Sequence, residues 1–167
     1  KPEKIKTYEL VVEQNVGDHL RVLGSLNQYH ISGLISQTID TTDGKLFYDN
    51  VDNITARGVE LTMEGKWATG LEGRFSYALQ TTHNDNTDRQ LTNSPQHLTK
   101  ANLIVPVIED KLFAGFEGRY TSSRLTLADN NASPFYILNM SLFSQRIVKG
   151  WELSGHINNL MNQKYGY

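Results

Sequence analysis

The residues best placed for ligand or metal chemistry lie in and around a polar stretch at positions 84–97. His83 and His97 flank this stretch, and imidazole nitrogens bind metal ions and haem iron. A histidine beside a solvated loop is nevertheless more often a plain surface residue. The sequence therefore predicts no metal site from these two histidines, and it leaves them as candidates for ligand contact.

The same stretch places oxygen-bearing side chains close together, as calcium-binding loops do. These are Asn84, Asp85, Asn86 and Asp88. A calcium loop of the EF-hand type then requires a glycine and a bidentate glutamate at positions that Arg89 and Pro95 occupy. A polar surface turn explains the pattern better, so neither a metal ion nor a cofactor is predicted.

The sequence also shows no recognisable combination of catalytic groups. Ser76 is not within a nucleophile-elbow motif, so its combination with a histidine does not indicate a hydrolase. Six carboxylates and guanidinium groups in mid-chain could in principle act as acids and bases, but solvated or paired charges on one face of a sheet explain them better. These six are Glu60, Glu64, Glu72, Arg74, Glu117 and Arg119. The sequence predicts a protein that is not an enzyme.

The charged residues belong to segments that alternate between apolar and polar side chains. In ARGVELTMEGKW, at 56–67, Val59, Leu61 and Met63 alternate with Glu60 and with further polar residues. Successive side chains of a strand point to opposite faces, so one face is apolar and the other charged. A soluble sandwich would bury the apolar face, whereas a membrane barrel would turn it outwards to lipid.

Alternation of this kind recurs along the whole chain and predicts an all-β protein. We expect eight strands, several of them long enough to cross a bilayer at a tilt. The expected ranges are 7–14, 20–35, 46–64, 71–83, 98–107, 112–123, 135–147 and 151–162. Aromatic residues gather towards their ends, as interface girdles do: Tyr8, Tyr29, Phe47, Tyr48, Trp67, Tyr120, Phe135, Tyr136 and Trp151.

Short and long connections alternate between these strands. The short ones are 15–19, 65–70, 108–111 and 148–150, and the long polar ones are 36–45, 84–97 and 123–134. In an antiparallel meander every second connection lies at the same end of the sheet. All short turns are thus expected at one end and all long loops at the other, which is typical of outer-membrane barrels.

Composition excludes several other classes. The 167 residues include 16 Lys plus Arg and 18 Asp plus Glu, for a formal net charge of -2, and like charges form no block. Nucleic acid is therefore not an expected partner. Cysteine is absent, which excludes disulfides and thiolate metal sites within this sequence. The longest apolar run, 103–108, is far too short for a spanning helix.

Several motifs, in order and over nearly the whole chain, resemble the C-terminal part of the barrel of TonB-dependent outer-membrane receptors. They are KPEKIKTYELVVEQ, YDNVDNITARGVELTMEG, GRFSYALQTTHND, LTNSPQHLTKANLIVP and INNLMNQKYGY. The resemblance implies that residues 1–167 are a partial antiparallel up-and-down transmembrane β-barrel in the bacterial outer membrane. A plug domain, its energy-coupling box and the closing strand are not found in this sequence.

The resemblance also implies a function and partners. Such receptors take up ferric siderophores, cobalamin or haem, driven by the TonB energy-coupling complex through a plug that fills a barrel of about 22 strands. The long loops would meet the ligand first, so ligand contact is expected from His83, Asp85, Asp88, Arg89, His97 and Arg124. The six mid-strand charges named above would face the lumen, and the apolar face would contact outer-membrane lipid.

Two alternatives stay open at this point. One is a complete eight-stranded outer-membrane barrel with a structural or adhesive role, and the other is a soluble β-sandwich or lipocalin-like binding module. If the chain is part of a larger barrel, its first and last strands are raw edges. We expect those edges either to close a smaller barrel or to pair with a second copy.

Overall fold

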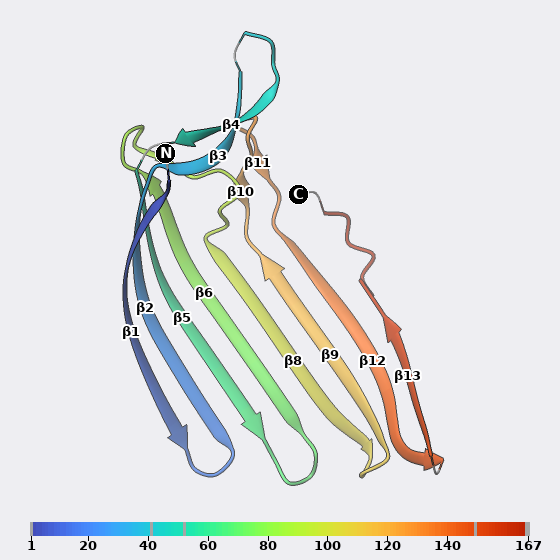
Figure 1. The fold of residues 1–167 in the computed structure, drawn as a ribbon. Helices are drawn as coiled ribbons and strands as arrows, with labels where there is room; N and C mark the ends of the chain where they lie inside the picture. The colour runs from blue at the N-terminus through green and yellow to red at the C-terminus, as the bar shows by residue number, and fades with distance from the viewer. Residues whose placement is uncertain (1, 41, 52, 149, 166–167) are drawn as a thin grey trace.

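The computed structural model describes residues 2–40, 42–51, 53–148 and 150–165 and shows one long antiparallel sheet (Figure 1). Neighbouring strands in space are also neighbours along the chain, apart from small sheets within the loops, so the predicted up-and-down meander is confirmed. In spatial order its strands are β1 (Lys4–Val16), β2 (Leu20–Ser32), β5 (Ile54–Lys66), β6 (Glu72–Asn84), β8 (His97–Ile108), β9 (Leu112–Thr121), β12 (Phe135–Val148) and β13 (Trp151–Ile157).

Short turns lie at one end of the sheet and long connections at the other, as the alternation predicts (Figure 1). Residues with positive φ make several of these turns, among them Gly17 at 62° and Asp110 at 56°. Glycine adopts this region without strain, and aspartate tolerates it better than most residues do. The turns keep consecutive strands antiparallel and in register.

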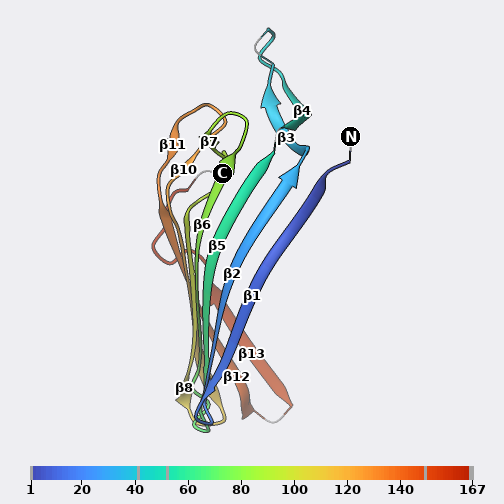
Figure 2. The same ribbon diagram turned by 90° about the vertical axis from the view of Figure 1, so that its left-hand side faces the viewer.

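The long connections contain small sheets that sequence reasoning missed. β3 (Leu34–Ile39) and β4 (Leu46–Val51) form a hairpin that projects beyond the main sheet (Figure 2). The predicted strands 20–35 and 46–64 are each broken where this hairpin begins and ends, at Gly33 (φ 68°) and near Asn53. Further along, β7 (Arg89–Gln90) pairs with β6, and β10 (Arg124–Leu125) pairs with β11 (Asn131–Ala132). The last predicted strand, 151–162, ends at Ile157.

The apolar face of the sheet is not covered by a second layer. Among the described residues, the buried hydrophobic side chains are Ile54, Ala114 and Phe135. Val59 is 46% exposed and Leu61 37%, although both lie in the middle of the sheet. A sandwich would bury such residues, so the soluble-sandwich alternative is wrong. No helix in the described part of the chain is long and apolar enough to cross a membrane.

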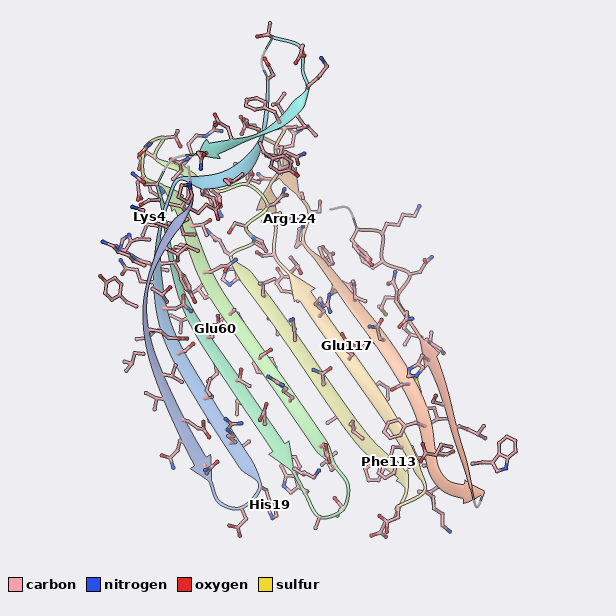
Figure 3. All side chains as sticks on the ribbon, viewed as in Figure 1. Lys4, His19, Glu60, Phe113, Glu117 and Arg124 are labelled. Atoms are coloured by element: carbon pink, nitrogen blue, oxygen red, sulfur yellow. The ribbon has the colours of Figure 1, made fainter. Side chains whose placement is uncertain are left out.

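The two faces follow from the register of the strands. Residues directly opposite in an antiparallel pair share a face, so Val59 lies with Leu26 and Leu79, and Glu64 lies with Arg21 and Arg74. We call these the apolar face and the charged face. The sheet is curved, with β1 and β13 on the same side of its central strands (Figure 2). Figure 3 looks onto the charged face, which bears Glu60 and Glu117.

Five of the nine strand-end aromatics lie on the apolar face near its two ends. Tyr8, Tyr120 and Tyr136 are at the loop end, and Trp67 and Trp151 are at the turn end. All five are exposed, as expected for side chains at a membrane interface. By register, Tyr29 and Phe135 point to the charged face instead, and Phe47 and Tyr48 belong to the projecting hairpin.

The sheet is open. Within the described residues, β1 pairs only with β2 and β13 pairs only with β12. The expectation that the chain closes a smaller barrel is therefore wrong, and so is the alternative of a closed eight-stranded barrel. Pairing of the edges with a second copy stays a prediction.

The exposed apolar face predicts that a charge added at two neighbouring positions of one strand will cause very different losses of stability. Leu61→Arg places a guanidinium in the middle of the apolar face, which costs about 2–4 kcal/mol when that face meets the bilayer centre. The matched variant Thr62→Arg adds the same group one residue later, on the charged face. Urea unfolding in lipid vesicles measures the stability of both variants. Equal losses of stability would show that the apolar face does not contact lipid.

Candidate functional site

A row of ion pairs crosses four strands on the charged face. The Arg21 guanidinium of β2 donates to Glu13 of β1, with Nε–Oε1 at 2.7 Å, and to Glu64 of β5, with Nη1–Oε2 at 3.3 Å. Glu64 also lies 3.3 Å from Arg74 Nε on β6. Each pair is exposed to solvent, which screens it, so it contributes little to stability by itself. Their shared effect is to order one row of side chains across β1, β2, β5 and β6.

Of the other predicted charges of this face, Glu117 continues the register row of Glu64 and Arg74 through Asn102, and the rest lie in other rows. Glu72 Oε1 is 2.5 Å from Lys66 Nζ, and Glu117 Oε1 is 3.6 Å from Arg119 Nη2. Glu60 lies opposite Ser25 and Ala78 in the register. All six residues expected to face the lumen thus share one face of the sheet, and their direction towards a lumen stays a prediction.

Sequence reasoning missed Glu13 and Arg21, which complete the row of ion pairs. Their strands carry apolar residues on the charged face as well, at Val11 and Leu23, so alternation there is weaker than in β5. At the turn end the same face has a cleft of about 610 Å³. Its lining includes Asp18, His19, Arg21, Glu64, Lys66, Glu72 and Arg74.

The residues expected to contact ligand are spread over the loop end, and most have local partners. His83 Nε2 lies 2.7 Å from Asp88 Oδ1, and Asp85 Oδ2 accepts a 2.9 Å hydrogen bond from Thr55. His97 Nδ1 lies 2.8 Å from the Tyr77 hydroxyl, on the apolar face. The structure thus separates the two histidines instead of joining them at one ion. In the part of the chain that the structure describes, no group of three or more His, Asp or Glu side chains could hold a metal ion.

Arg124 is buried, at 7% exposure, where β10 meets the top of β12. Its guanidinium carbon lies 5.8 Å from the centre of the Phe135 ring, in cation–π geometry. Tyr165 stacks on Phe135, with ring centres 5.0 Å apart. Figure 3 shows Arg124 at the loop end of the sheet. These contacts give Arg124 a role in holding the loop and the C-terminal segment together, and its ligand contact stays a prediction.

Arg89 joins two long connections at a cleft. Its Nη2 donates to Asp129 Oδ1 at 2.8 Å, and the backbone N–H of Asn93 donates to the carbonyl of Leu125 at 2.7 Å. A cleft of about 470 Å³ lies beside this tie. The cleft is lined by residues of β3, of 84–92 and of 125–129. These include Gln37, Thr38, Ile39, Asn84, Gln90, Leu91, Leu127 and Asp129.

Arg89 is the predicted ligand residue that lines this cleft, and Asp129 is one that sequence reasoning missed. The sequence held a signal for Asp129, since it lies in the long polar connection 123–134 beside two asparagines. Its partner, however, is 40 residues away in the chain. With polar side chains around a few leucines, the cleft suits an organic ligand of moderate size.

The tip of the projecting hairpin is held by its own carboxylates. The backbone N–H of Thr42 donates to Asp40 at 2.7 Å and lowers the pKa of that carboxyl. Lys45 Nζ donates to Asp43 at 2.6 Å and likewise lowers the pKa of Asp43. Both carboxyls are ionised at neutral pH, so the tip carries local charge into solvent.

An open, curved meander with an uncovered apolar face, a charged face and sorted loops defines a piece of an outer-membrane barrel. The family model "TonB dependent receptor-like, beta-barrel" matches residues 1–160, and the chain belongs to this family. Members of the family are transporters of the bacterial outer membrane, not enzymes.

Solved structures share the fold at low sequence identity. The copper transporter OprC superposes with a TM-score of 0.80 at 20% identity, covering 99% of this chain and 26% of that one. The ferric yersiniabactin uptake receptor FyuA from Yersinia pestis gives 0.79 at 17%, covering 98% and 26%. The ferripyoverdine receptor of Pseudomonas aeruginosa gives 0.76 at 15%, covering 99% and 24%.

This chain therefore spans about a quarter of the length of the solved receptors that it matches. A search among curated proteins found no match. The fold and the family are thus established, and the substrate is a matter for proposal.

The row of ion pairs predicts that Glu64 stabilises the sheet more than Glu60 does. Glu64→Gln weakens two pairs and leaves Arg74 without its carboxylate, which should cost about 1 kcal/mol of unfolding free energy. Glu60→Gln, the control on the same strand, should cost little. Urea unfolding at low and high salt measures both variants, and the difference should shrink at high salt. Identical midpoints at low salt would contradict the role given to the row.

Proposed function

We propose that this chain is part of an outer-membrane receptor for TonB-coupled uptake of a ferric siderophore or a similar large nutrient. The family match over residues 1–160 carries the proposal, because members of this family are outer-membrane transporters. The uncovered apolar face supports a lipid contact, and the charged face supports an aqueous interior.

In this proposal the sheet is a scaffold and the loop end receives the ligand. Strand pairing satisfies the backbone groups, as the hydrocarbon layer requires. The cleft beside Arg89 and Asp129 is the first contact for a ligand arriving from outside. A plug domain elsewhere in the full-length receptor would lie against the charged face and connect the ligand to TonB.

Uptake by the full-length receptor tests the function. Cells that lack their own receptors would express it and receive radiolabelled hydroxamate and catecholate ferric siderophores, cobalamin, haem and copper in separate assays. We expect uptake of one ferric siderophore or a nutrient of similar size, and its loss when the tonB gene is deleted. Uptake that persists without TonB, or no uptake from this panel, would contradict the proposal.

The cleft predicts a role for Arg89 in ligand affinity. Arg89→Gln removes a cation from the cleft and should weaken binding of the transported ligand by roughly tenfold, the size expected for one hydrogen bond to a charged group. Asp129→Asn breaks the same ion pair but keeps the cation, and it is the matched control. Equal losses in both variants would show that the pair only orders the loops.

A further inference from the structure

Acidic side chains are confined to one face of the sheet, which is a stricter separation than a water-filled interior alone requires. In the described spanning strands, every acidic residue lies on the charged face by register and alternation. These residues are Glu9, Glu13, Glu60, Glu64, Glu72, Glu117 and Glu152. The apolar face of the same strands therefore carries no carboxylate.

Three permanent cations do lie on the apolar face: Lys4, Lys6 and Arg57. Lys6 is opposite His30, and Arg57 is opposite Gln28, which is the next residue of β2 on the same face. All three are near the loop end of β1 and β5, which only β2 separates, and Figure 3 marks this end of β1 at Lys4. We call these three residues the outer cationic patch.

Residues of the patch differ from most cations of the charged face in their partners. Arg21, Lys66, Arg74 and Arg119 each lie within salt-bridge distance of a glutamate, whereas Lys100 of the same face is in none of the salt bridges among the described residues. Within the described residues, Lys4, Lys6 and Arg57 are exposed and form no salt bridge.

The other titratable groups near the patch bind local partners. His30 contacts Gln28 and Thr55, and His83 contacts Asp88. Asp85 accepts a hydrogen bond from Thr55 at 2.9 Å. Both carboxylates follow β6 in the loop, so they border the patch without pairing with its cations.

The position of the patch fits the headgroup level of a membrane. A Lys or Arg on the lipid face costs about 2–4 kcal/mol at the midplane and about 0–1 near the interface. The next row of the apolar face, towards the turn end, consists of Leu10, Leu26 and Val59, which are exposed and apolar. Snorkelling of long side chains explains why cations are tolerated there, but it does not explain their grouping on nearby strands.

We propose that the outer cationic patch binds the phosphate groups of lipid A in the outer leaflet. Strands lie about 4.8 Å apart, so cations on β1 and β5 are roughly 10 Å apart across the sheet. Flexible lysine and arginine side chains from this base can converge on one phosphorylated headgroup, while its acyl chains cover the apolar rows below. Clusters of basic residues beside a membrane surface recognise anionic headgroups in this way.

Direct binding to the purified full-length receptor tests the site. The probes are lipid A with both phosphates and its fully dephosphorylated form, each titrated into the receptor in neutral detergent. Each cation near a lipid surface contributes about 1 kcal/mol, which is roughly fivefold in affinity. We expect tighter binding of the phosphorylated form and a steep loss of that preference as salt rises.

Variants then locate the binding. Lys4→Gln, Lys6→Gln and Arg57→Gln together should weaken phosphorylated lipid A binding by on the order of a hundredfold and leave the dephosphorylated form unchanged. The control replaces Lys100 on the charged face and Lys111 in a turn with glutamine, and it should bind as the parent does. Arg57→Lys keeps the charge and should retain most of the affinity. Circular dichroism confirms that each variant is folded.

Two results would overturn the proposal. One is equal binding of the two lipid A forms by the parent receptor, a test that needs no variant. The other is equal affinity of the triple variant and the control for the phosphorylated form. Nutrient uptake is a separate measurement, so loss of uptake with intact lipid A binding, or the reverse, distinguishes failure of the proposed transport from failure of this site.

Discussion

Backbone pairing between neighbouring strands is the constraint on which the rest of the structure depends. β5 and β6 remain in register over thirteen pairs, from Ile54 opposite Asn84 to Lys66 opposite Glu72. A slip of one residue would move every side chain of a strand to the other face. It would bring Glu60 and Glu64 to the apolar face and Leu61 to the charged one. The alternation of charged and apolar side chains therefore favours one register over its neighbours. That register gives the sheet two chemically distinct surfaces.

The two faces carry charge in different ways. On the charged face, Arg21 lies between two glutamates from neighbouring strands, so positive and negative groups compensate one another where they are crowded. On the apolar face no carboxylate occurs within the described strands, and Lys4, Lys6 and Arg57 lie near one corner. In the proposed receptor, water on one side and lipid headgroups on the other would account for both distributions, since an unpaired charge is tolerated only where solvent or a counter-ion reaches it.

At the loop end the sheet acts as a rigid base for less regular structure. The two later connections are tied by Arg89 to Asp129 and by the backbone bond from Asn93 to Leu125. Below them, Arg124, Phe135 and Tyr165 join a loop to the C-terminal segment through ring and cation contacts. The hairpin β3–β4 approaches from the other side and completes the 470 Å³ cleft. At the opposite end the turns are short, so they offer little room for comparable irregular structure.

Local pattern was sufficient for the eight long strands of the sheet and their faces, but not for the ends of those strands beside the β3–β4 hairpin. Alternation has a period of two, so each strand shows its two faces without reference to any other strand. Glu60, Glu64, Glu72, Arg74, Glu117 and Arg119 were therefore assigned to one face correctly. Glycine and aspartate in the turns, and polar residues in the loops, similarly placed the connections at the correct ends.

Contacts between distant residues were decided only by the tertiary structure. Arg21 and Glu64 are 43 positions apart, and Arg89 and Asp129 are 40 apart. Which residues meet depends on the register of separate strands and on the path of each loop, and neither is written in a local pattern. The break at Gly33, the hairpin that follows it and the separation of His83 from His97 have the same origin. The sequence by itself determined which face each strand residue occupies, because that choice is local, and the fold decided which of those residues are partners.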